Sequence, residues 1–594
     1  MQIKYLDGKR FYRGLLAGGK AIIRNQNILN KINVFPVADA DTGINLAMTM
    51  KAIMEGNRIG KTLKETLHHV SDNALSGARG NSGIIFAQYL YGLSKELPEA
   101  GITTVKHFAE SAQRAVKHLY SSLMNPVEGT MLTVIREWAE NLEEQSHKTT
   151  DFLHALTSSL DAAKKSLQDT PNKLKVLADA GVVDAGASGF VIFLEGIVDY
   201  MHKGSLRDTE ESIGMAEEIV PFAGHTEAPG EFRYCTEAIL SGFTFPLEEV
   251  KQTVSRFGDS FILAGDVDKL HIHIHTNDPD RLFSTLFRLG EVRGAKVDDM
   301  LRQYQVSHQR KYPIGIVTDT ASDLPQELLD QYQILQIPFG INIGSRSYLD
   351  KFTIQPERFY SMLKTSPQHP VSSQPSPNTV KGVLDFAADN FERVISVHIS
   401  NKLTGIFETV SAYAAQRNDT RVGFINSRQL SVTEGLITLR IARAVEAGMT
   451  FEDILAQADT WIGSTKIYTD INTLRYMVRG GRVKPLTGFV AALLNLKPIV
   501  SLDQDGKAQA FGKSFSRKGN MRKILALVGK EVAQRGIWEY AIVHADALER
   551  AEKYAEALTA ITGQKPAYIM PLSPVVGVHN GNGTVGIGVC YGRP

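Results

Sequence analysis

The sequence has little of what would place it in a specialised class of protein. Only two of its 594 residues are cysteine, Cys235 and Cys590, which excludes a disulfide framework and suits a reducing compartment. No run approaches the roughly 20 apolar residues of a membrane-spanning helix, and the N-terminus becomes charged before a signal-type apolar run can develop. Lys+Arg 65 against Asp+Glu 64 leaves a formal charge of +1, so charge gives no reason to expect nucleic acid as a partner. We therefore expect a cytoplasmic protein without a transmembrane segment.

The chain is long enough for several domains, because about 150 residues is typical of one. Residues 1–203 carry apolar side chains at helical spacing, whereas residues 204–228 are acidic and irregular, as in a linker. Strand and helix patterns mix in residues 229–310, and buried strands alternate with helices in residues 311–594. We predict a multidomain fold with an all-α N-terminal domain, a small α/β middle domain and a two-lobed α/β C-terminal domain.

Two carboxylates stand close together in the first candidate site. Asp39 and Asp41 are two residues apart in a short loop, and such pairs hold Mg²⁺ on nucleotide phosphates. Asn33, upstream, could supply a further oxygen. The alternative is a turn that caps the helix expected to start near Asn45.

A glycine-rich loop favours the first interpretation. Residues 77–83, Gly-Ala-Arg-Gly-Asn-Ser-Gly, allow a close approach of the backbone to phosphate, with Asn81 and Ser82 as donors and a helix N-terminus next to them. The Gly-Lys-[Ser/Thr] ending of a Walker A loop is missing. The carboxylate pair and this loop together predict a Mg²⁺–nucleotide site.

Alternating histidines mark a candidate metal site in the middle region. His271, His273 and His275 would share one face of a strand, so two imidazoles could reach one ion, and Cys235 on another expected strand offers a soft third ligand. A His/Cys set favours zinc. A solvated strand edge is the alternative, and the spacing does not separate a catalytic from a structural metal.

The C-terminal region contains hydroxyl-rich and glycine-rich loops. Residues 371–376 and 399–405 place Ser and Thr donors beside backbone N–H groups, a combination that suits a carboxylate. Residues 479–482, Arg-Gly-Gly-Arg, and residues 579–583, His-Asn-Gly-Asn-Gly, add a guanidinium and an imidazole. Each loop alone is more typical of an ordinary turn.

The N-terminal loops as an ordered set resemble the DhaL-type nucleotide-binding domain, and more closely the kinase subunit of bacterial fatty acid kinase. The matching segments are residues 33–45, 77–83, 126–132 and 180–186. The resemblance implies an all-helical barrel that binds Mg·ATP at one end, with Asp39 and Asp41 as catalytic Mg²⁺ ligands. It assigns nucleotide binding to Asn33, Asn45, Asn81, Ser82, Thr130 and Leu132.

The rest of the chain resembles two further parts of the same system. Tyr234-Cys-Thr-Glu and His273-Ile-His-Thr-Asn-Asp-Pro are similar to the middle domain of that kinase subunit, which implies Zn²⁺ on Cys235, His273 and His275. Residues 312–594 resemble DegV proteins, the fatty-acid-binding partners of the kinase, through residues 317–325, 372–376, 403–405, 480–482 and His579. This second likeness implies that the carboxyl head is bound by Ser372, Ser373, Thr404 and Gly405, and that Arg482 and His579 act in catalysis.

The expected function is therefore an ATP-dependent kinase that converts a bound long-chain fatty acid to an acyl phosphate, with kinase and lipid carrier fused in one chain. A homodimer and transient contact with a membrane surface or an acyltransferase are compatible with this role. A dihydroxyacetone-type kinase and a non-catalytic lipid-binding protein stay open as alternatives. The family's Pro-Asp-Gly-Asp is Ala38-Asp39-Ala40-Asp41 here, and an alanine costs about 1 kcal/mol if that position needs a positive φ.

Overall fold

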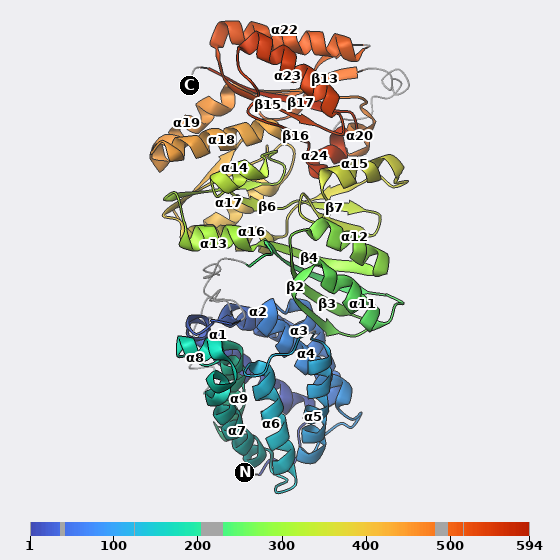
Figure 1. Ribbon diagram of the computed structural model, residues 1–594, viewed down its shortest axis with the longest axis vertical. Coiled ribbons are helices and arrows are strands. Elements are labelled where there is room, and N and C mark those ends of the chain that lie inside the picture. The colour runs from blue at the N-terminus through green and yellow to red at the C-terminus, as the bar shows by residue number, and fades with distance from the viewer. Residues whose placement is uncertain are drawn as a thin grey trace. The chain divides into compact units, whose positions relative to one another are not determined.

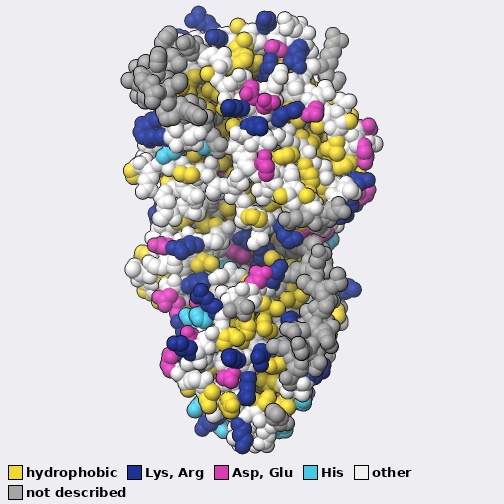
Figure 2. Space-filling view, turned by 180° about the vertical axis from the view of Figure 1, so that it is seen from behind, with side chains coloured by type: hydrophobic (Ala, Val, Ile, Leu, Met, Phe, Trp, Pro, Cys, Tyr) yellow, Lys and Arg dark blue, Asp and Glu magenta, His cyan; other side chains and the backbone are white. Residues whose placement is uncertain are grey.

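The computed structural model describes residues 2–35, 42–56, 58–123, 125–203, 230–417, 419–481, 497–514 and 516–592. The chain divides into two compact units, residues 1–278 with 285–308, and residues 279–284 with 309–594. None of the helices in the described ranges is long and apolar enough to cross a membrane. On the face shown in Figure 2, cationic and anionic side chains are interspersed, consistent with the balanced formal charge.

The first unit begins with an all-helical domain, drawn in blue to teal in Figure 1. Amphipathic sequences build it, as in the helix over 105–121, whose Val105, Phe108, Ala112 and Leu119 are buried at helical spacing. The helices are α1 (Gly8–Lys31), α2 (Thr42–Glu55), α3 (Leu63–Gly77), α4 (Gly80–Glu96), α5 (Val105–Ser121), α6 (Met131–Ser146), α7 (Phe152–Lys173), α8 (Lys175–Ala180) and α9 (Ala185–Lys203).

Aromatic rings and one close helix contact fix the core of this domain. Phe86 on α4 meets Phe193 on α9 edge to face, with ring centroids 4.9 Å apart, and Trp138 on α6 meets Phe190 at 5.6 Å. Helices α1 and α9 lie backbone to backbone at Gly18, where an added Cβ would stand 2.6 Å from the carbonyl oxygen of Phe193. The core therefore brings helices that are far apart in sequence into a single bundle.

The middle domain belongs to the first unit, apart from residues 279–284. It consists of an antiparallel sheet in the order β2-β3-β1-β4 with helices beside it. The elements are β1 (Tyr234–Ser241), α11 (Leu247–Val254), β2 (Gly258–Gly265), β3 (Leu270–Thr276), α12 (Pro279–Leu289), β4 (Glu291–Asp299) and α13 (Met300–His308). Helix and strand mix here as the sequence predicts, and the strand pairing is antiparallel throughout.

The second unit is an α/β domain with two main sheets. A parallel sheet in the order β11-β10-β5-β6 comprises β5 (Ile314–Asp319), β6 (Leu335–Ile337), β10 (Arg393–His398) and β11 (Val422–Asn426). A mixed sheet in the order β14-β13-β12-β17-β15-β16 comprises β12 (Thr465–Asp470), β13 (Lys497–Leu502), β14 (Ala508–Ser514), β15 (Ile537–His544), β16 (Ile569–Pro571) and β17 (Val585–Tyr591). A small sheet pairs β7 (Gly340–Ile343) with β8 (Arg346–Leu349) and β9 (Val371–Ser373).

Helices cover these sheets. Helices α22 (Arg517–Arg535) and α23 (Leu548–Thr562) lie over one face of the mixed sheet (Figure 1), where Ile524, Val528 and Tyr554 join its apolar core. The other helices are α14 (Gln326–Gln331), α15 (Pro356–Thr365), α16 (Pro377–Asn390), α17 (Ile406–Arg417), α18 (Val432–Glu446), α19 (Phe451–Gly463), α20 (Arg475–Arg479) and α24 (Pro574–Asn580).

Candidate functional site

The N-terminal ends of several helices meet at one end of the helical domain. Gly80, at the start of α4, has φ +57°, and an added Cβ would stand 2.2 Å from Nδ2 of Asn45 on α2. At Gly186, on α9, an added Cβ would lie 3.1 Å from both Ser82 Oγ on α4 and Met131 Cε on α6. The first turns of α2, α4, α6 and α9 are thus neighbours. Their N–H groups and dipoles favour an anion, such as a phosphate.

Side chains from the last turn of α1 and from the segment after it hold the start of α2. Asn30 Oδ1 accepts hydrogen bonds from the backbone N–H groups of Gly43 (2.8 Å) and Ile44 (3.2 Å). The Thr42 hydroxyl donates to Oδ1 of Asn33, also at 2.8 Å. The helix begins at Thr42, slightly before the expected start near Asn45. Asn33, a predicted nucleotide-site residue, is buried and holds this helix end in place.

The glycine-rich loop contributes polar atoms to this end. Asn81 Oδ1 is buried and has no hydrogen-bond partner among the described residues, as expected of an atom that faces a ligand position. The loop itself is fixed from α2, because the Arg79 N–H donates to Thr49 Oγ1 at 3.3 Å. Asp39 and Asp41, the predicted Mg²⁺ ligands, fall in residues 36–41, outside the described residues.

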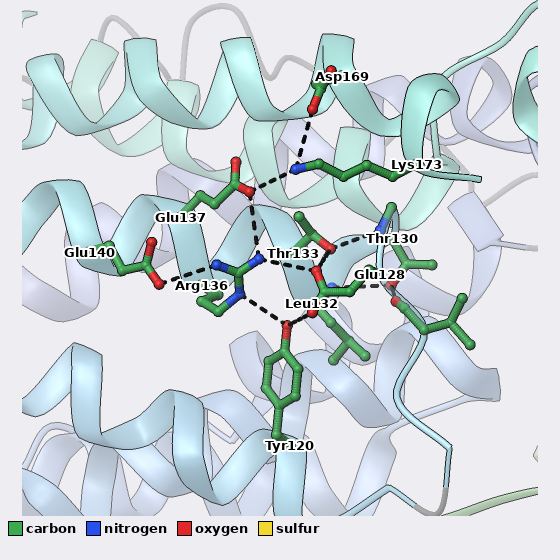
Figure 3. Close-up of polar contacts among 12 residues, drawn as sticks. Tyr120, Glu128, Thr130, Leu132, Thr133, Arg136, Glu137, Glu140, Asp169 and Lys173 are labelled. Carbon is green, nitrogen blue, oxygen red and sulfur yellow. Dashed lines mark hydrogen bonds and ion pairs between the residues drawn. The ribbon is translucent and has the colours of Figure 1, made fainter.

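A network of charged side chains holds the loop before α6 (Figure 3). Thr130 is the N-cap of α6: its Oγ1 accepts from the Leu132 N–H at 3.4 Å. Upstream of it, Glu128 accepts from the Thr133 hydroxyl at 2.5 Å and pairs with Arg136 at 3.1 Å. The remaining members of the network are Tyr120, Glu137, Glu140, Asp169 and Lys173. The predicted residues Thr130 and Leu132 are therefore rigidly placed.

Asp184 was not assigned a role from the sequence, although it lies in residues 180–186, one of the segments that resemble the DhaL-type domain. It is buried at the start of α9 and accepts from the Ala187 N–H at 2.7 Å. Burial raises its pKa to about 6, against a lowering contribution from that hydrogen bond. Its Oδ1 lies 3.3 Å from the Cβ that Gly186 lacks, next to Ser82. A buried carboxyl group thus belongs to this end of the domain, and the unusual burial of an Asp is a signal only the fold reveals.

The middle-domain sheet places the predicted zinc ligands on one face. Cys235 on β1 is directly opposite His275 on β3, and Glu237 is opposite His273. The ligand atoms of Cys235, His273 and His275 all lie within 4.8 Å of one another. Cys235 Sγ is 3.8 Å from His273 Nδ1, and the rings of His273 and His275 are 5.2 Å apart. His271 lies on the same face, outside this cluster.

The donor set fits a zinc ion. Burial lowers the pKa of His273 below its ordinary value, which keeps the ring neutral, the form that binds metal. Its Nε2 is buried and has no hydrogen-bond partner among the described residues. A thiolate and neutral imidazoles are the ligands that Zn²⁺ prefers.

Glu237 is charged although it is buried. Burial by itself raises the pKa of this carboxyl, but the charge of Lys296 and the hydrogen bond with His273 outweigh it and hold the pKa well below the usual range. Lys296 Nζ is 3.9 Å from Oε2, and His273 Nδ1 is 3.3 Å from Oε1. Sequence reasoning missed Glu237 as a site residue, but its position two residues after Cys235 already places both on one face of a strand.

The second unit contains a cavity of about 450 Å³, within the range of small-molecule sites. Its apolar walls come from the mixed sheet, from the segments that follow β6 and β10, and from α24, and they include Phe339, Ile399, Ile467, Val500 and Val575. Ser372, Ser373, Thr404, Gly405 and His579, all predicted from the sequence, line the same cavity. An apolar space with a group of hydroxyls and one imidazole is suited to an amphipathic acid.

Loops from distant parts of the chain meet at the polar end of this cavity. The hydroxyl of Ser372, on β9, lies 3.1 Å from Nε2 of His579, on α24. Gly480, after α20, packs so closely that an added Cβ would be 2.3 Å from His579 Nδ1. The Arg-Gly-Gly-Arg and His-Asn-Gly loops of the sequence are therefore neighbours. Arg482 itself falls in residues 482–496, outside the described residues.

A buried carboxylate orders the loops at the ends of β5 and β10. Asp319 accepts from the N–H groups of Ala321 (3.0 Å) and Ile399 (3.2 Å), and its Oδ2 lies 3.0 Å from His398 Nδ1. Burial and the neighbouring Asp319 raise the pKa of Glu434 well above its ordinary value. The carboxyl ends of parallel strands meet at one edge of a sheet, and here that edge faces the cavity.

Further polar residues line the cavity without having been predicted, among them Gln374, Asn401 and Lys402. Gln374 packs against Gly405, where an added Cβ would be 2.7 Å from its Nε2. These residues lie inside the hydroxyl-rich segments 371–376 and 399–405. The segments were therefore recognised, while the contribution of each side chain depends on how the two loops meet.

Comparison with protein-family models divides the chain into three matching regions. Residues 36–199 match the DAK2 domain, residues 231–307 match the FakA-like middle domain of fatty acid kinase, and residues 313–592 match the uncharacterised DegV family. One chain therefore carries these three domains in this order, as the resemblance in the sequence implies.

Curated relatives cover part of this arrangement. An uncharacterized protein of Staphylococcus saprophyticus is 32% identical over 330 residues, 54% of this chain and 59% of that protein. An uncharacterized protein of Staphylococcus aureus strain USA300 is 32% identical over 314 residues, 51% of this chain and 57% of that protein. The chain spans somewhat less than three fifths of the length of these curated relatives.

Solved structures match nearly half of the chain. A DegV family protein from Thermus thermophilus, described for its fatty acid binding, is 26% identical and covers 47% of this chain and 99% of its own, with a TM-score of 0.44. DegV from Bacillus subtilis, described as a fatty acid binding protein, is 26% identical and covers 47% of this chain and 100% of its own, with a TM-score of 0.43.

Proposed function

We propose that this protein is an ATP-dependent fatty acid kinase, because the chain carries a DAK2 domain, a fatty acid kinase-like middle domain and a DegV domain. The observation that carries the proposal is the combination of the three domain matches with an apolar cavity whose polar end contains Ser372 and His579. A nucleotide-binding half and a lipid-binding half then belong to one reaction.

The acyl chain would occupy the apolar part of the cavity, where each buried CH₂ contributes about 0.8 kcal/mol. Its carboxylate would accept hydrogen bonds from the hydroxyls of Ser372, Ser373 and Thr404, with the Gly405 backbone beside them. Water is then excluded from the acyl chain, while the acid stays accessible at the polar end. His579, held by Ser372 and packed against Gly480, would meet the incoming phosphoryl group together with Arg482.

The helical end of the first unit would hold the nucleotide. Asn81 Oδ1, which has no partner in the described part of the chain, and the neighbouring helix N-termini fit a Mg²⁺–phosphate group, with Asn33, Asn45, Ser82, Thr130 and Leu132 around it. Asp39 and Asp41 would hold Mg²⁺, which neutralises phosphate charge when bound. In the reaction a carboxylate oxygen of the fatty acid forms a bond to the γ-phosphorus, and the bond from that phosphorus to the ADP oxygen breaks.

The decisive assay is ATP consumption by the purified full-length chain with Mg²⁺ and oleate, with the acyl phosphate trapped by hydroxylamine. We expect consumption that depends on oleate, loss of it in Asp41→Asn with lipid binding retained, and loss of it in His579→Ala with nucleotide binding retained. Consumption that depends on dihydroxyacetone instead would favour the small-molecule kinase. Lipid binding without Mg·ATP binding would favour a non-catalytic carrier.

Zinc in the middle domain is a separate part of the proposal. Cys235, His273 and His275 would hold the ion, in a role that is structural in the simplest case. Metal analysis of untreated protein should find about one zinc per chain, and Cys235→Ala with His273→Ala should abolish it. Cys590→Ala is the matched control, because that thiol is buried against Thr465 in the second unit. Full zinc content in the double variant would refute the assignment.

A further inference from the structure

One carboxylate oxygen of the middle domain contacts both candidate centres of the first unit. Glu237 Oε1 lies 3.3 Å from Nδ1 of His273, in the metal cluster, and accepts the N–H of Gly80, also at 3.3 Å. Gly80 is the first residue of α4, directly before Asn81 and Ser82. The same atom therefore joins a predicted zinc ligand to the loop predicted to bind phosphate.

The rest of α4 is also attached to the middle domain. In the middle of the helix, Gln88 Oε1 accepts from the Gly265 N–H at 2.6 Å, and at its end Lys95 pairs with Asp266 at 2.8 Å. These two contacts hold the helix against strand β2, independently of Glu237. A change in the position of Glu237 therefore alters the first turn of α4, because the contacts of Gln88 and Lys95 lie further along the helix.

The surroundings of Glu237 leave its carboxylate little freedom. Its side chain is 6% exposed, and its second oxygen faces Lys296 at 3.9 Å. A carboxylate beside a metal-bound imidazole commonly orients the ring, and the ring in turn orients the carboxylate. The N-cap residue of α4, Arg79, makes no side-chain capping bond, so Glu237 supplies an acceptor at that helix end.

We propose that Glu237 is a positioning residue that couples the Cys235–His273–His275 cluster to the first turn of α4, so that zinc in the cluster orders the phosphate loop. This inference rests on the proposed nucleotide and zinc sites. Glu237 itself does not touch substrate. Zinc in the cluster would fix the orientation of the His273 ring, and the ring would in turn fix the position of Glu237 Oε1. That oxygen would then hold the N–H group of Gly80 in place. Nucleotide affinity then depends on a metal that is not part of the nucleotide site.

The test uses the full-length protein with and without zinc, removed by a chelator, and two readouts. The first is hydrogen exchange of the backbone amides at the start of α4; the second is calorimetric binding of Mg·ADP. In the wild type, we expect zinc removal to speed exchange at Gly80 and to weaken Mg·ADP binding about tenfold to a hundredfold, the effect of one hydrogen bond to a charged group. In Glu237→Gln, exchange should be fast and binding weak already with zinc present, and neither should respond to the chelator.

Controls separate the coupling from general damage. Glu248→Gln alters an exposed carboxylate at the start of α11 in the same domain and should behave as wild type. One zinc per chain in Glu237→Gln shows that it is folded; if it does not fold, Glu237→Asp, which keeps the charge and shortens the reach, should show the same loss. Exchange at Gly80 that is insensitive to zinc in the wild type would overturn the coupling. Zinc-dependent exchange without any Mg·ADP binding would support the coupling and refute the proposed function.

Discussion

Substitution of Ser372 by alanine separates the two ends of the lipid cavity. Ser372 Oγ lies 3.1 Å from His579 Nε2, and both residues line the cavity. If this hydroxyl donates to the fatty acid carboxylate, its removal costs about 1.5–3 kcal/mol, the value for a hydrogen bond to a charged group. That corresponds to roughly a tenfold to a hundredfold higher Kd.

The acyl chain supplies an independent measure. Each added CH₂ contributes about 0.8 kcal/mol, or about fourfold in Kd, as long as the cavity of about 450 Å³ can receive it. A series of saturated acids, titrated against the wild type and Ser372→Ala, should therefore give two parallel lines of log Kd against chain length. The variant line is displaced towards weaker binding, and its slope is unchanged.

The outcome that refutes this reasoning is equally specific. A change of slope without a displacement would mean that Ser372 contacts the acyl chain and not the head group. No dependence on chain length would mean that the cavity does not take up the acyl chain. Ser361→Ala, at an exposed position on α15, is the matched control and should reproduce the wild-type line.

Three further predictions concern the first unit. Gly80→Ala should destabilise it by about 1–2 kcal/mol in thermal unfolding, because φ is +57°, whereas Gly101→Ala, with open space around it, should be neutral. Burial raises the pKa of Asp184 to about 6, so its contribution to stability is complete below about pH 4 and is lost as the pH rises through 6. In denaturant unfolding, the free energy of unfolding of Asp184→Asn should therefore exceed that of the wild type by up to about 3 kcal/mol near pH 8 and should equal it near pH 3. Arg136→Ala should cost less than about 1 kcal/mol, since these ion pairs are partly exposed, yet should raise protease sensitivity around Glu128; unchanged cleavage there would contradict the role of the network.

The fold class could be predicted from the sequence more completely than the geometry of the candidate sites. Helical periodicity over residues 1–203 and strand–helix alternation after residue 311 predict the two fold types, since these patterns follow from local burial. The strand at 393–398 lies in the region of predicted strand–helix alternation, and the helix at 279–289 lies in the region where both patterns mix. Antiparallel pairing in the middle domain was not predicted, because periodicity describes one strand and not its partner.

For the candidate sites as well, the residue types could be predicted from the sequence but their contacts could not. Cys235 and His275 are 40 positions apart, and the strand pattern predicted that each lies on a strand, but only the register of β1 with β3 makes them cross-strand neighbours. The meeting of Ser372 with His579 likewise depends on long-range packing over 207 positions. Spacing in sequence selected the correct chemical types, and tertiary structure decided which of them meet.

The segment Tyr234-Cys-Thr-Glu was recognised from the sequence, but the role of Glu237 within it was not. Its charge suggests a solvent-exposed residue, because a carboxylate is rarely buried without partners. In this fold, Lys296, His273 and the Gly80 N–H supply those partners from a different strand of the same sheet, from the Cys235–His273–His275 cluster and from another domain. A buried charge with three separate partners is costly to assemble for stability alone, since an apolar side chain of similar size would serve as well. Its position between two candidate sites therefore favours a role in coupling them over a role in packing.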